Sequence, residues 1–263
     1  MKNTSLGSKD STLISVLQSH FKGELSLPRV KLICLFITSL CKIKTINYDR
    51  LASGFDTKAN KNSSYRRIQR FMKEFDFSMK LVSSLIFNLL PLKSDLVLVL
   101  DRTNWKFGSQ NINILMLGIS YRNVAFPLMF KMLDKRGNSD TEERIELIKK
   151  YIEWFGSETI DCLLADREFV GSEWLAFLNQ NNIRYYIRIR NNFKIYSYQK
   201  QKEIKAFWLF NNLKVGEFYH YPKIVELHGQ RCYLSGSKTI DREGKMEFLI
   251  LVSFNKPEQA MEY

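Results

Sequence analysis

Leu96-Val-Leu-Val-Leu-Asp101, followed by Arg102-Thr-Asn-Trp105, is the stretch of the sequence that decides the fold. Five consecutive apolar residues, rich in β-formers and ending in polar residues, predict a strand that is buried on both faces. We expect this strand to end at Asp101. A carboxylate at the carboxyl end of a buried strand lies where open α/β sheets place their chemistry.

A second stretch repeats the pattern, because the apolar-rich run 160–165 leads into Asp166, Arg167 and Glu168. Two strand ends that each carry an Asp offer hard oxygen ligands to a divalent cation such as Mg²⁺ or Mn²⁺. Asp also ends strands as a turn former or helix cap, so a purely structural role is the alternative for each residue. The occurrence of both in one basic chain favours Asp101 and Asp166 as catalytic and metal-binding residues.

The elements around these two stretches predict the fold class. A short turn at 121–124 makes an antiparallel hairpin of the strands on either side, and Ser139 with Glu142 forms a capping-box pattern at a helix start. The expected strands are 96–101, 112–121, 124–133, 160–166 and 183–190, with helices before and after the fourth. This order is the RNase H-like arrangement, and the right-handed crossover rule brings the strand before Asp166 beside the strand before Asp101. We therefore predict an α/β fold with an RNase H-like mixed sheet core.

The blocks Asp101-Arg-Thr-Asn-Trp105 and Ala165-Asp-Arg-Glu-Phe-Val-Gly171 resemble the first two catalytic blocks of the IS4-type DDE transposases of bacterial insertion sequences. The resemblance runs from about Ser63 to the C-terminus. It implies a core that uses magnesium to cut transposon ends and join them to target DNA. Asp101 would bridge two metal ions and Asp166 would hold one. A homodimer in the DNA complex is compatible with this reading.

The third carboxylate of that family is a Glu in a Tyr-x-x-Arg-x-x-x-Glu block, which this sequence lacks. Glu168 follows Asp166 too closely to replace a group from a separate helix, and Glu258 and Glu262 lack the motif. The sequence ends about where the block would begin, so we expect a truncated, nearly inactive transposase. The alternatives are an RNase H-like metal nuclease and a non-enzymatic DNA-binding remnant of a transposase.

The expected organisation has four parts: a helical DNA-end-binding region (1–92), the first part of the catalytic core (93–192), a β-rich insertion (193–255) and the start of the C-terminal catalytic helix (256–263). Similar transposases carry a helical DNA-end-binding region and a β-rich insertion in these positions. In the insertion, Trp208 is expected to be packed, with stacking on a base as the alternative.

The composition agrees with a nucleic-acid partner. Lys and Arg number 40 against 27 Asp and Glu, which gives a formal charge of +13 and suits a polyanion. A basic membrane-surface protein is the alternative, but no strongly amphipathic basic helix stands out, and the apolar stretch 32–41 is too short to span a bilayer. The four cysteines show no metal-like spacing to one another or to the histidines, so a zinc site is not expected. They indicate reduced, buried thiols of a cytoplasmic protein.

Two basic clusters are candidate DNA contacts. The first lies on a helix that we expect to be capped by Ser63 or Ser64, where a solvated basic face is the alternative. The second lies on one face of the strand 183–190. Its arginines are expected either to form bidentate contacts with phosphates or to pair with acidic residues of the neighbouring helix. The residues predicted to bind DNA are Arg66, Arg67, Arg70, Lys73, Arg188 and Arg190.

Overall fold

Residues 8–240 and 243–254 are described by the computed structural model. The chain separates into two compact units, Met1–Leu85 and Ile86–Tyr263. The predicted start of a C-terminal catalytic helix, 256–263, lies outside the described residues, as do Glu258 and Glu262. None of the helices in the described ranges combines the length and hydrophobicity needed to cross a membrane.

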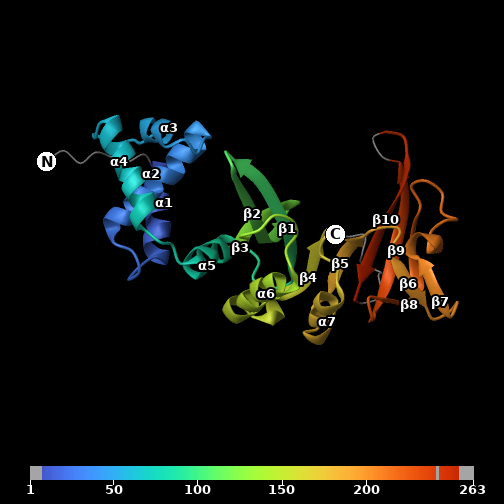
Figure 1. Ribbon diagram of the computed structural model, residues 1–263. Coiled ribbons are helices and arrows are strands. Elements are labelled where there is room, and N and C mark those ends of the chain that lie inside the picture. Colours follow the sequence, from blue (N-terminus) through green and yellow to red (C-terminus); the bar gives the residue numbers. More distant parts are fainter. Residues whose placement is uncertain (1–7, 241–242, 255–263) are drawn as a thin grey trace. The chain divides into compact units, whose positions relative to one another are not determined.

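The first unit is built from helices that bury small apolar clusters between them (Figure 1). They are α1 (Ser8–His20), α2 (Leu27–Ile43), α3 (Tyr48–Ser53), α4 (Lys61–Glu74) and the first part of α5 (Met79–Leu89). Pro28 lies in the first turn of α2, where its missing N–H costs no helical hydrogen bond. Leu51 and Ile68, both fully buried, belong to one cluster, and Leu17 and Phe21 belong to another.

Helices α3 and α4 each begin with an asparagine cap. The side chain of Asn47 accepts a hydrogen bond from the Arg50 N–H (3.1 Å), so α3 starts after Ile46. The sequence predicts a helix over 46–54 with Ile46 packed inward, but Ile46 is 80% exposed, so this prediction is wrong. Asn60 accepts from the Ser63 N–H (2.8 Å), so the predicted serine cap of α4 is also wrong. In both cases an Asn side chain satisfies an N–H that the helix itself leaves unpaired.

The cysteines are free thiols, as predicted. Cys34, Cys162 and Cys232 are buried, whereas Cys41 is exposed, so the prediction of burial is wrong for Cys41.

The second unit is a mixed sheet with helices on one face. Its order along the chain is β1 (Leu96–Phe107), β2 (Gln110–Tyr121), β3 (Val124–Met132), α6 (Thr141–Phe155), η1 (Ser157–Thr159), β4 (Ile160–Ala165), α7 (Ser172–Gln180), β5 (Tyr185–Ile189), β6 (Lys194–Ser197), β7 (Lys202–Lys205), η2 (Ala206–Leu209), β8 (Phe218–Leu227), β9 (Gln230–Ile240) and β10 (Met246–Ser253). Among the described residues, ten strands form one sheet in the order β3-β2-β1-β4-β5-β10-β9-β8-β6-β7. The strands of residues 193–255 therefore extend the sheet through β10, which pairs antiparallel with β5.

The hairpin of β2 and β3 and the parallel pairing of β1 with β4 were both predicted and are confirmed. Arg122 and Asn123 form the two-residue turn of the hairpin, both with positive φ (51° and 62°), as the twist of a tight hairpin requires. β4 also pairs parallel with β5. The two stretches that the sequence singled out thus become neighbouring parallel strands.

The prediction that β1 ends at Asp101 is wrong, because the strand continues to Phe107. Its antiparallel ladder with β2 runs on from Asp101↔Met116 to Phe107↔Gln110 and supplies backbone partners beyond the carboxylate. The parallel ladder with β4 does stop before it, at Leu100↔Ala165. Asp101 therefore lies at the end of the β1–β4 pairing but within the strand.

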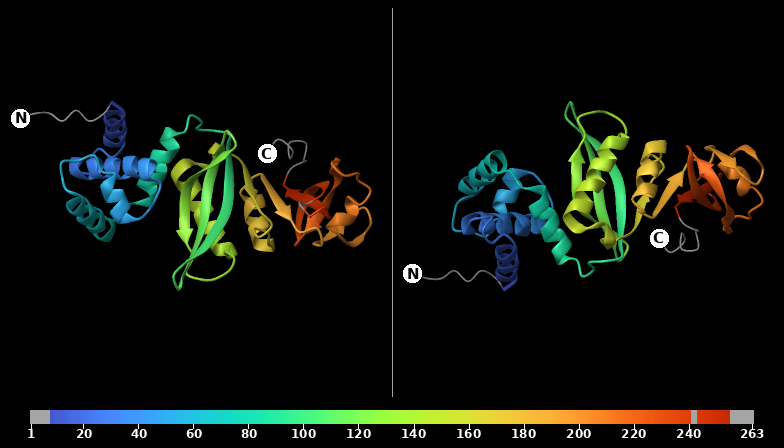
Figure 2. Two further views of the ribbon diagram at one scale, coloured as in Figure 1. Left: turned by 90° about the horizontal axis from the view of Figure 1, so that it is seen from above. Right: turned by 90° about the horizontal axis from the view of Figure 1, so that it is seen from below.

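Helices α6 and α7 cover the same face of the sheet (Figures 1 and 2). The capping box of α6 is Asp140 with Glu143, one residue later than predicted: the Asp140 carboxylate accepts from the Glu143 N–H (2.9 Å), and the Glu143 carboxylate accepts from the Asp140 N–H (2.8 Å). The sequence predicts that Ile145, Ile148, Ile152 and Phe155 form the buried side of α6; this is confirmed for Ile148, whereas the other three are only partly buried. Its buried residues are Arg144, Leu147, Ile148 and Tyr151.

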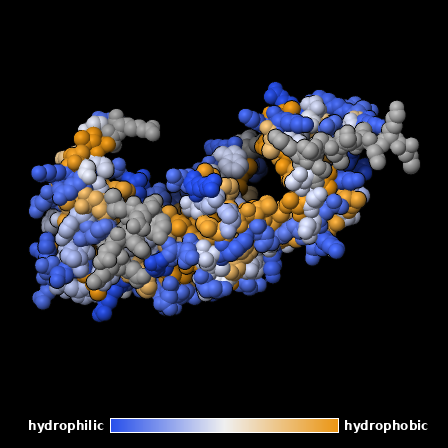
Figure 3. Space-filling model, turned by 180° about the vertical axis from the view of Figure 1, so that it is seen from behind, coloured by the Kyte–Doolittle hydropathy of each residue, from blue (hydrophilic) through white to orange (hydrophobic). Residues whose placement is uncertain are grey.

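The two faces of the sheet differ in burial. Leu98, Leu100 and Leu163 point toward the helices and are at most 1% exposed, and each such side chain stabilises the fold by about 1.5–3 kcal/mol. Val97, Val99 and Leu164 on the other face are only partly buried. Hydrophobic residues also reach the surface among hydrophilic ones in the space-filling view (Figure 3). The second face is the one that leads to Asp101 and Asp166, because alternate strand residues share a face.

Candidate functional site

Asp101 and Asp166 lie side by side on the partly buried face of the sheet. Each follows a member of the last β1–β4 pair, Leu100↔Ala165, and paired residues of parallel strands point to the same face. Both carboxylates are exposed. They line a cleft of about 330 Å³, whose other lining residues are Val99, Leu100, Leu164, Ala165, Tyr186, Arg188 and Leu251.

The oxygens of the two carboxylates are largely free of protein partners. One Asp101 oxygen accepts a hydrogen bond from the Arg102 N–H (2.7 Å), and the backbone carbonyl of Asp166 accepts from the Phe169 N–H (2.9 Å). Within the described ranges neither carboxylate forms an ion pair. The side chain of a structural helix cap would instead accept hydrogen bonds from backbone N–H groups of the helix.

The donor set fits a hard divalent cation. Two exposed carboxylates with available oxygens are the protein contribution that Mg²⁺ or Mn²⁺ ordinarily takes, with water and phosphate oxygens completing the shell. Among the described residues there is no group of three or more His, Cys, Asp or Glu side chains that would hold a metal ion. Two ligands alone imply weak binding, because few anionic groups attract the cation.

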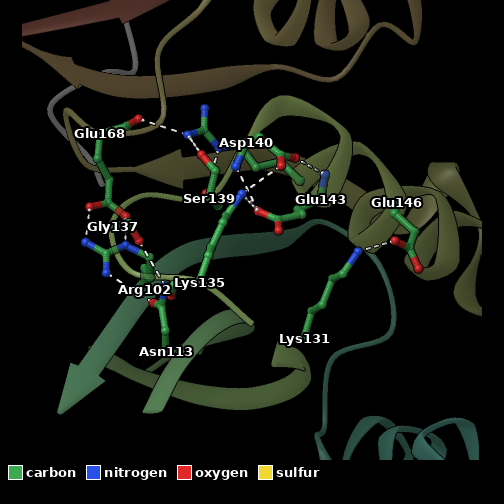
Figure 4. A network of polar contacts seen from close by, with 11 residues as sticks. Arg102, Asn113, Lys131, Lys135, Gly137, Ser139, Asp140, Glu143, Glu146 and Glu168 are labelled. Atoms are coloured by element: carbon green, nitrogen blue, oxygen red, sulfur yellow. Dashed lines mark hydrogen bonds and ion pairs between the residues drawn. The ribbon is translucent and has the colours of Figure 1, made fainter. Parts of the chain in front are cut away.

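A bidentate ion pair anchors the turn after Asp166 to β1 (Figure 4). Arg102 donates from Nε to one Glu168 oxygen (2.8 Å) and from Nη2 to the other (2.9 Å). This pairing raises the pKa of the Arg102 guanidinium. Arg102 also donates to the side-chain oxygens of Asn113 and Asn138 (3.2 Å each). Both carboxylate oxygens of Glu168 are therefore bound by Arg102, and Glu168 does not add a third carboxylate to Asp101 and Asp166.

The same network holds the loop between β3 and α6. The buried Asn113 amide donates to the backbone carbonyls of Lys135 and Gly137 (2.9 Å each). Arg144 donates to the Ser139 hydroxyl (2.8 Å) and to the Glu168 carbonyl (3.2 Å), and burial lowers the pKa of Arg144. Its guanidinium also lies over the Phe169 ring, at 5.2 Å from the centroid. The loop and the turn that carries Asp166 are thus tied together by shared donors.

The basic residues of α4 lie in the first unit on the side away from its core. Ile68 and Ser64 are buried, whereas Arg66, Arg70 and Lys73 are exposed. Arg67 is partly buried. No described residue pairs with any of the four, so this face is available to an anionic partner. Its role in DNA binding stays a prediction.

The arginines in and beside β5 differ in their partners. Arg184 forms an ion pair with Asp161, and Arg188 forms one with Glu247 (2.7 Å). Asp161 and Glu247 lie on the strands next to β5. The alternative of pairing with acidic residues of the neighbouring helix is therefore wrong in its source, although two of the arginines are paired. Arg190 is exposed, and no described residue pairs with it. Trp208 is 50% exposed, so the expectation that it is packed is wrong.

The residues that sequence reasoning missed are the ones that hold the site in place. Arg102 and Glu168 both stand next to the predicted ligands, yet neither was given a partner. The available signal was strand alternation: a residue adjacent to Asp101 in a strand must point to the covered face, where a charge requires a partner. Asn113, a polar residue at the start of an apolar strand, gave a similar signal.

No protein-family model matches the chain, and no match is found among curated proteins. Two solved structures are similar over part of their length. Marinitoga piezophila Argonaute, in complex with a 5′-OH guide RNA and target DNA, is 12% identical with a TM-score of 0.25, over 76% of this chain and 28% of that one. The Drosophila P element transposase strand transfer complex is 10% identical with a TM-score of 0.32, over 80% and 49%. The chain spans less than two thirds of either, and likenesses this weak identify neither a family nor a function.

Glu168→Gln tests the anchoring ion pair, because it removes the charge and keeps the shape. The side chains of Arg102 and Glu168 are only 12% and 22% exposed, so solvent screens the pair weakly. We expect the free energy of unfolding to fall by about 1.5–3 kcal/mol, the range for hydrogen bonds to charged groups. Urea denaturation measures this change.

Lys150→Gln is the matched control, since it removes an ion pair to Glu146 whose side chains are both 46% exposed. Its expected cost is below about 0.5 kcal/mol. Equal costs for the two variants would contradict an anchoring role for Glu168.

Proposed function

We propose that this chain is a nucleic-acid enzyme with an RNase H-like core that cleaves phosphodiesters with a divalent metal held by Asp101 and Asp166. The observation that carries the proposal is the adjacency of these two residues. They are far apart in the sequence, yet they stand next to each other on one face of the sheet and line one cleft.

The topology of the first five strands supports the RNase H-like assignment. β3, β2 and β1 are antiparallel neighbours, and β1, β4 and β5 follow in parallel. Open sheets of this kind bind ligands at the carboxyl ends of their parallel strands, which is where the two carboxylates lie.

The cleft assigns a task to each of its side chains. Asp101 and Asp166 would hold Mg²⁺ or Mn²⁺, which, when bound, supplies Lewis-acid activation of a phosphodiester and of the attacking water. The hydrogen bond from the Arg102 N–H orients the Asp101 carboxylate. Val99, Leu164 and Leu251 form the apolar part of the cleft lining.

The finer reading is that of an IS4-type DDE transposase acting on insertion-sequence ends and target DNA. The two sequence blocks carry this part of the proposal, and the exposed basic face of α4 supports a DNA-binding role for the first unit. A second candidate is a DNA-binding protein without catalysis. It is favoured by the lack of a third metal-binding side chain near the two Asp residues in the described part of the chain.

The test of the metal site is a Mn²⁺ titration of the full chain, followed by electron paramagnetic resonance, together with cleavage of supercoiled DNA. We expect Asp101→Asn and Asp166→Asn each to weaken Mn²⁺ binding by about tenfold or more and to remove any metal-dependent cleavage. Asp134→Asn is the control, because Asp134 is exposed and has no described partner.

Unchanged Mn²⁺ affinity in both variants would refute the metal site. Mn²⁺ binding that depends on both Asp residues, without cleavage by the wild-type chain, would select the non-catalytic candidate.

The role of α4 is tested by the salt dependence of duplex DNA binding. Changing Arg66, Arg67 and Arg70 to Ala should weaken binding and flatten the slope of log K against log salt by about 0.9 for each lost phosphate contact. A triple change of Lys22, Lys31 and Lys42, all exposed in the same unit, removes the same charge elsewhere. If that control flattens the slope equally, α4 has no special role.

A further inference from the structure

The four-residue turn Asp166-Arg167-Glu168-Phe169 sends its side chains to different places. Glu168 is fixed by Arg102, and Phe169 is fully buried beneath Arg144. A hydrogen bond from the Phe169 N–H to the Asp166 carbonyl (2.9 Å) closes the turn. Arg167 is the exposed member that the site described above leaves without a role.

Arg167 lines a second, smaller cavity beside the cleft of the two Asp residues. This cavity, named here the arginine pocket, measures about 160 Å³ and is lined by Arg167, Arg188, Ile189, Arg190, Asn191, Asn192, Glu247 and Phe248. Arg188 also lines the cleft of Asp101 and Asp166. The two cavities therefore share a wall.

The arginine pocket carries excess positive charge. Three guanidinium groups face one carboxylate, and Glu247 is already bound by Arg188 (2.7 Å). The side chains of Arg167 and Arg190 have no partner among the described residues. Two cations that share one small cavity repel each other unless an anion neutralises them. Phosphate oxygens suit guanidinium groups in particular, because the planar fork donates two parallel hydrogen bonds.

The backbone at the end of β5 is held in place around this pocket. The Phe193 N–H donates to the Arg190 carbonyl (3.1 Å), and the Phe207 N–H donates to the Asn191 carbonyl (3.1 Å). The amide side chains of Asn191 and Asn192 add neutral donors to the lining. The arginines are thus presented from a fixed turn and a fixed strand end, which lowers the entropic cost of binding.

We propose that the arginine pocket binds a phosphate group of a nucleic-acid strand, next to the phosphodiester that Asp101 and Asp166 address. Arg167 and Arg190 are its principal ligands, and Asn191 and Asn192 complete it. The assignment of a strand as the source of the phosphate rests on the proposed function, whereas the pocket's affinity for a phosphate oxyanion does not.

The test is the affinity of the full chain for a short, unphosphorylated single-stranded DNA, measured by fluorescence anisotropy without divalent metal. The double variant Arg167→Ala, Arg190→Ala should bind at least about tenfold more weakly, as the loss of charged hydrogen bonds implies. Its slope of log K against log salt should flatten by about 0.7, which is one single-strand phosphate contact. The double variant Arg167→Lys, Arg190→Lys keeps the charge but loses the fork, so it should recover only part of the affinity.

Arg122→Ala, Arg231→Ala is the matched control, since both residues are exposed cations of the same unit. Equal losses in the control and the pocket variant would overturn the proposal and leave only bulk charge. Titration with inorganic phosphate, followed by calorimetry, distinguishes a free phosphate ion from a phosphate of a nucleic-acid strand as the bound group. If the Ala variant loses phosphate binding but keeps its affinity for DNA, the pocket takes a free phosphate and the strand assignment is wrong.

Mn²⁺ binding separates this proposal from the proposed function, because it depends on Asp101 and Asp166, whereas metal-free DNA affinity reports on the arginine pocket. If the pocket variant binds DNA normally while the Asp variants lose Mn²⁺, the pocket is wrong and the metal site stands. If the pocket variant binds DNA weakly while the Asp variants bind Mn²⁺ normally, the arginine pocket is supported and the metal site is wrong.

Discussion

The parallel pairing of β1 with β4 is the constraint on which the rest of the site depends. Side chains alternate between the faces of a sheet, so a slip of one residue in this pairing would move Asp166 to the face covered by α6 and α7. The register is enforced by burial: Leu98 and Leu163, which pair across the two strands, are completely buried against the helices. The hydrophobic core thereby fixes the relative position of two exposed carboxylates.

The same alternation gives neighbouring residues opposite tasks. Asp101 faces the cleft while Arg102 faces the covered side, and Asp166 faces the cleft while Glu168 turns back to Arg102. Each sequence block thus supplies one carboxylate that lines the cleft and one residue of the anchoring ion pair. Arg102 adjoins Asp101, and Glu168 lies two residues after Asp166, so the strength of the ion pair limits how far the two Asp carboxylates move apart.

The core of the fold and the pair of Asp residues could be predicted, because they rest on long apolar runs and on the handedness of a crossover. The predictions that are wrong concern the ends of strands and helices, where several local partners are available to the same backbone groups. β1 runs past Asp101 because β2 offers it backbone partners, and Asn60 rather than a serine caps α4. The partners of Arg102 and Arg188 could not be found in the sequence, since Glu168 and Glu247 reach them only through the turn after β4 and the pairing of β5 with β10.

The proposed function requires that Asp101 and Asp166 form one divalent-metal site. The most direct test is a crystal structure of the full chain soaked with Mn²⁺, in which anomalous scattering locates the ion. We expect a peak in the cleft, at about 2–2.5 Å from carboxylate oxygens of both residues, and no such peak in the Asp166→Asn variant. A well-occupied Mn²⁺ elsewhere in the chain, with none between these two residues, would contradict it.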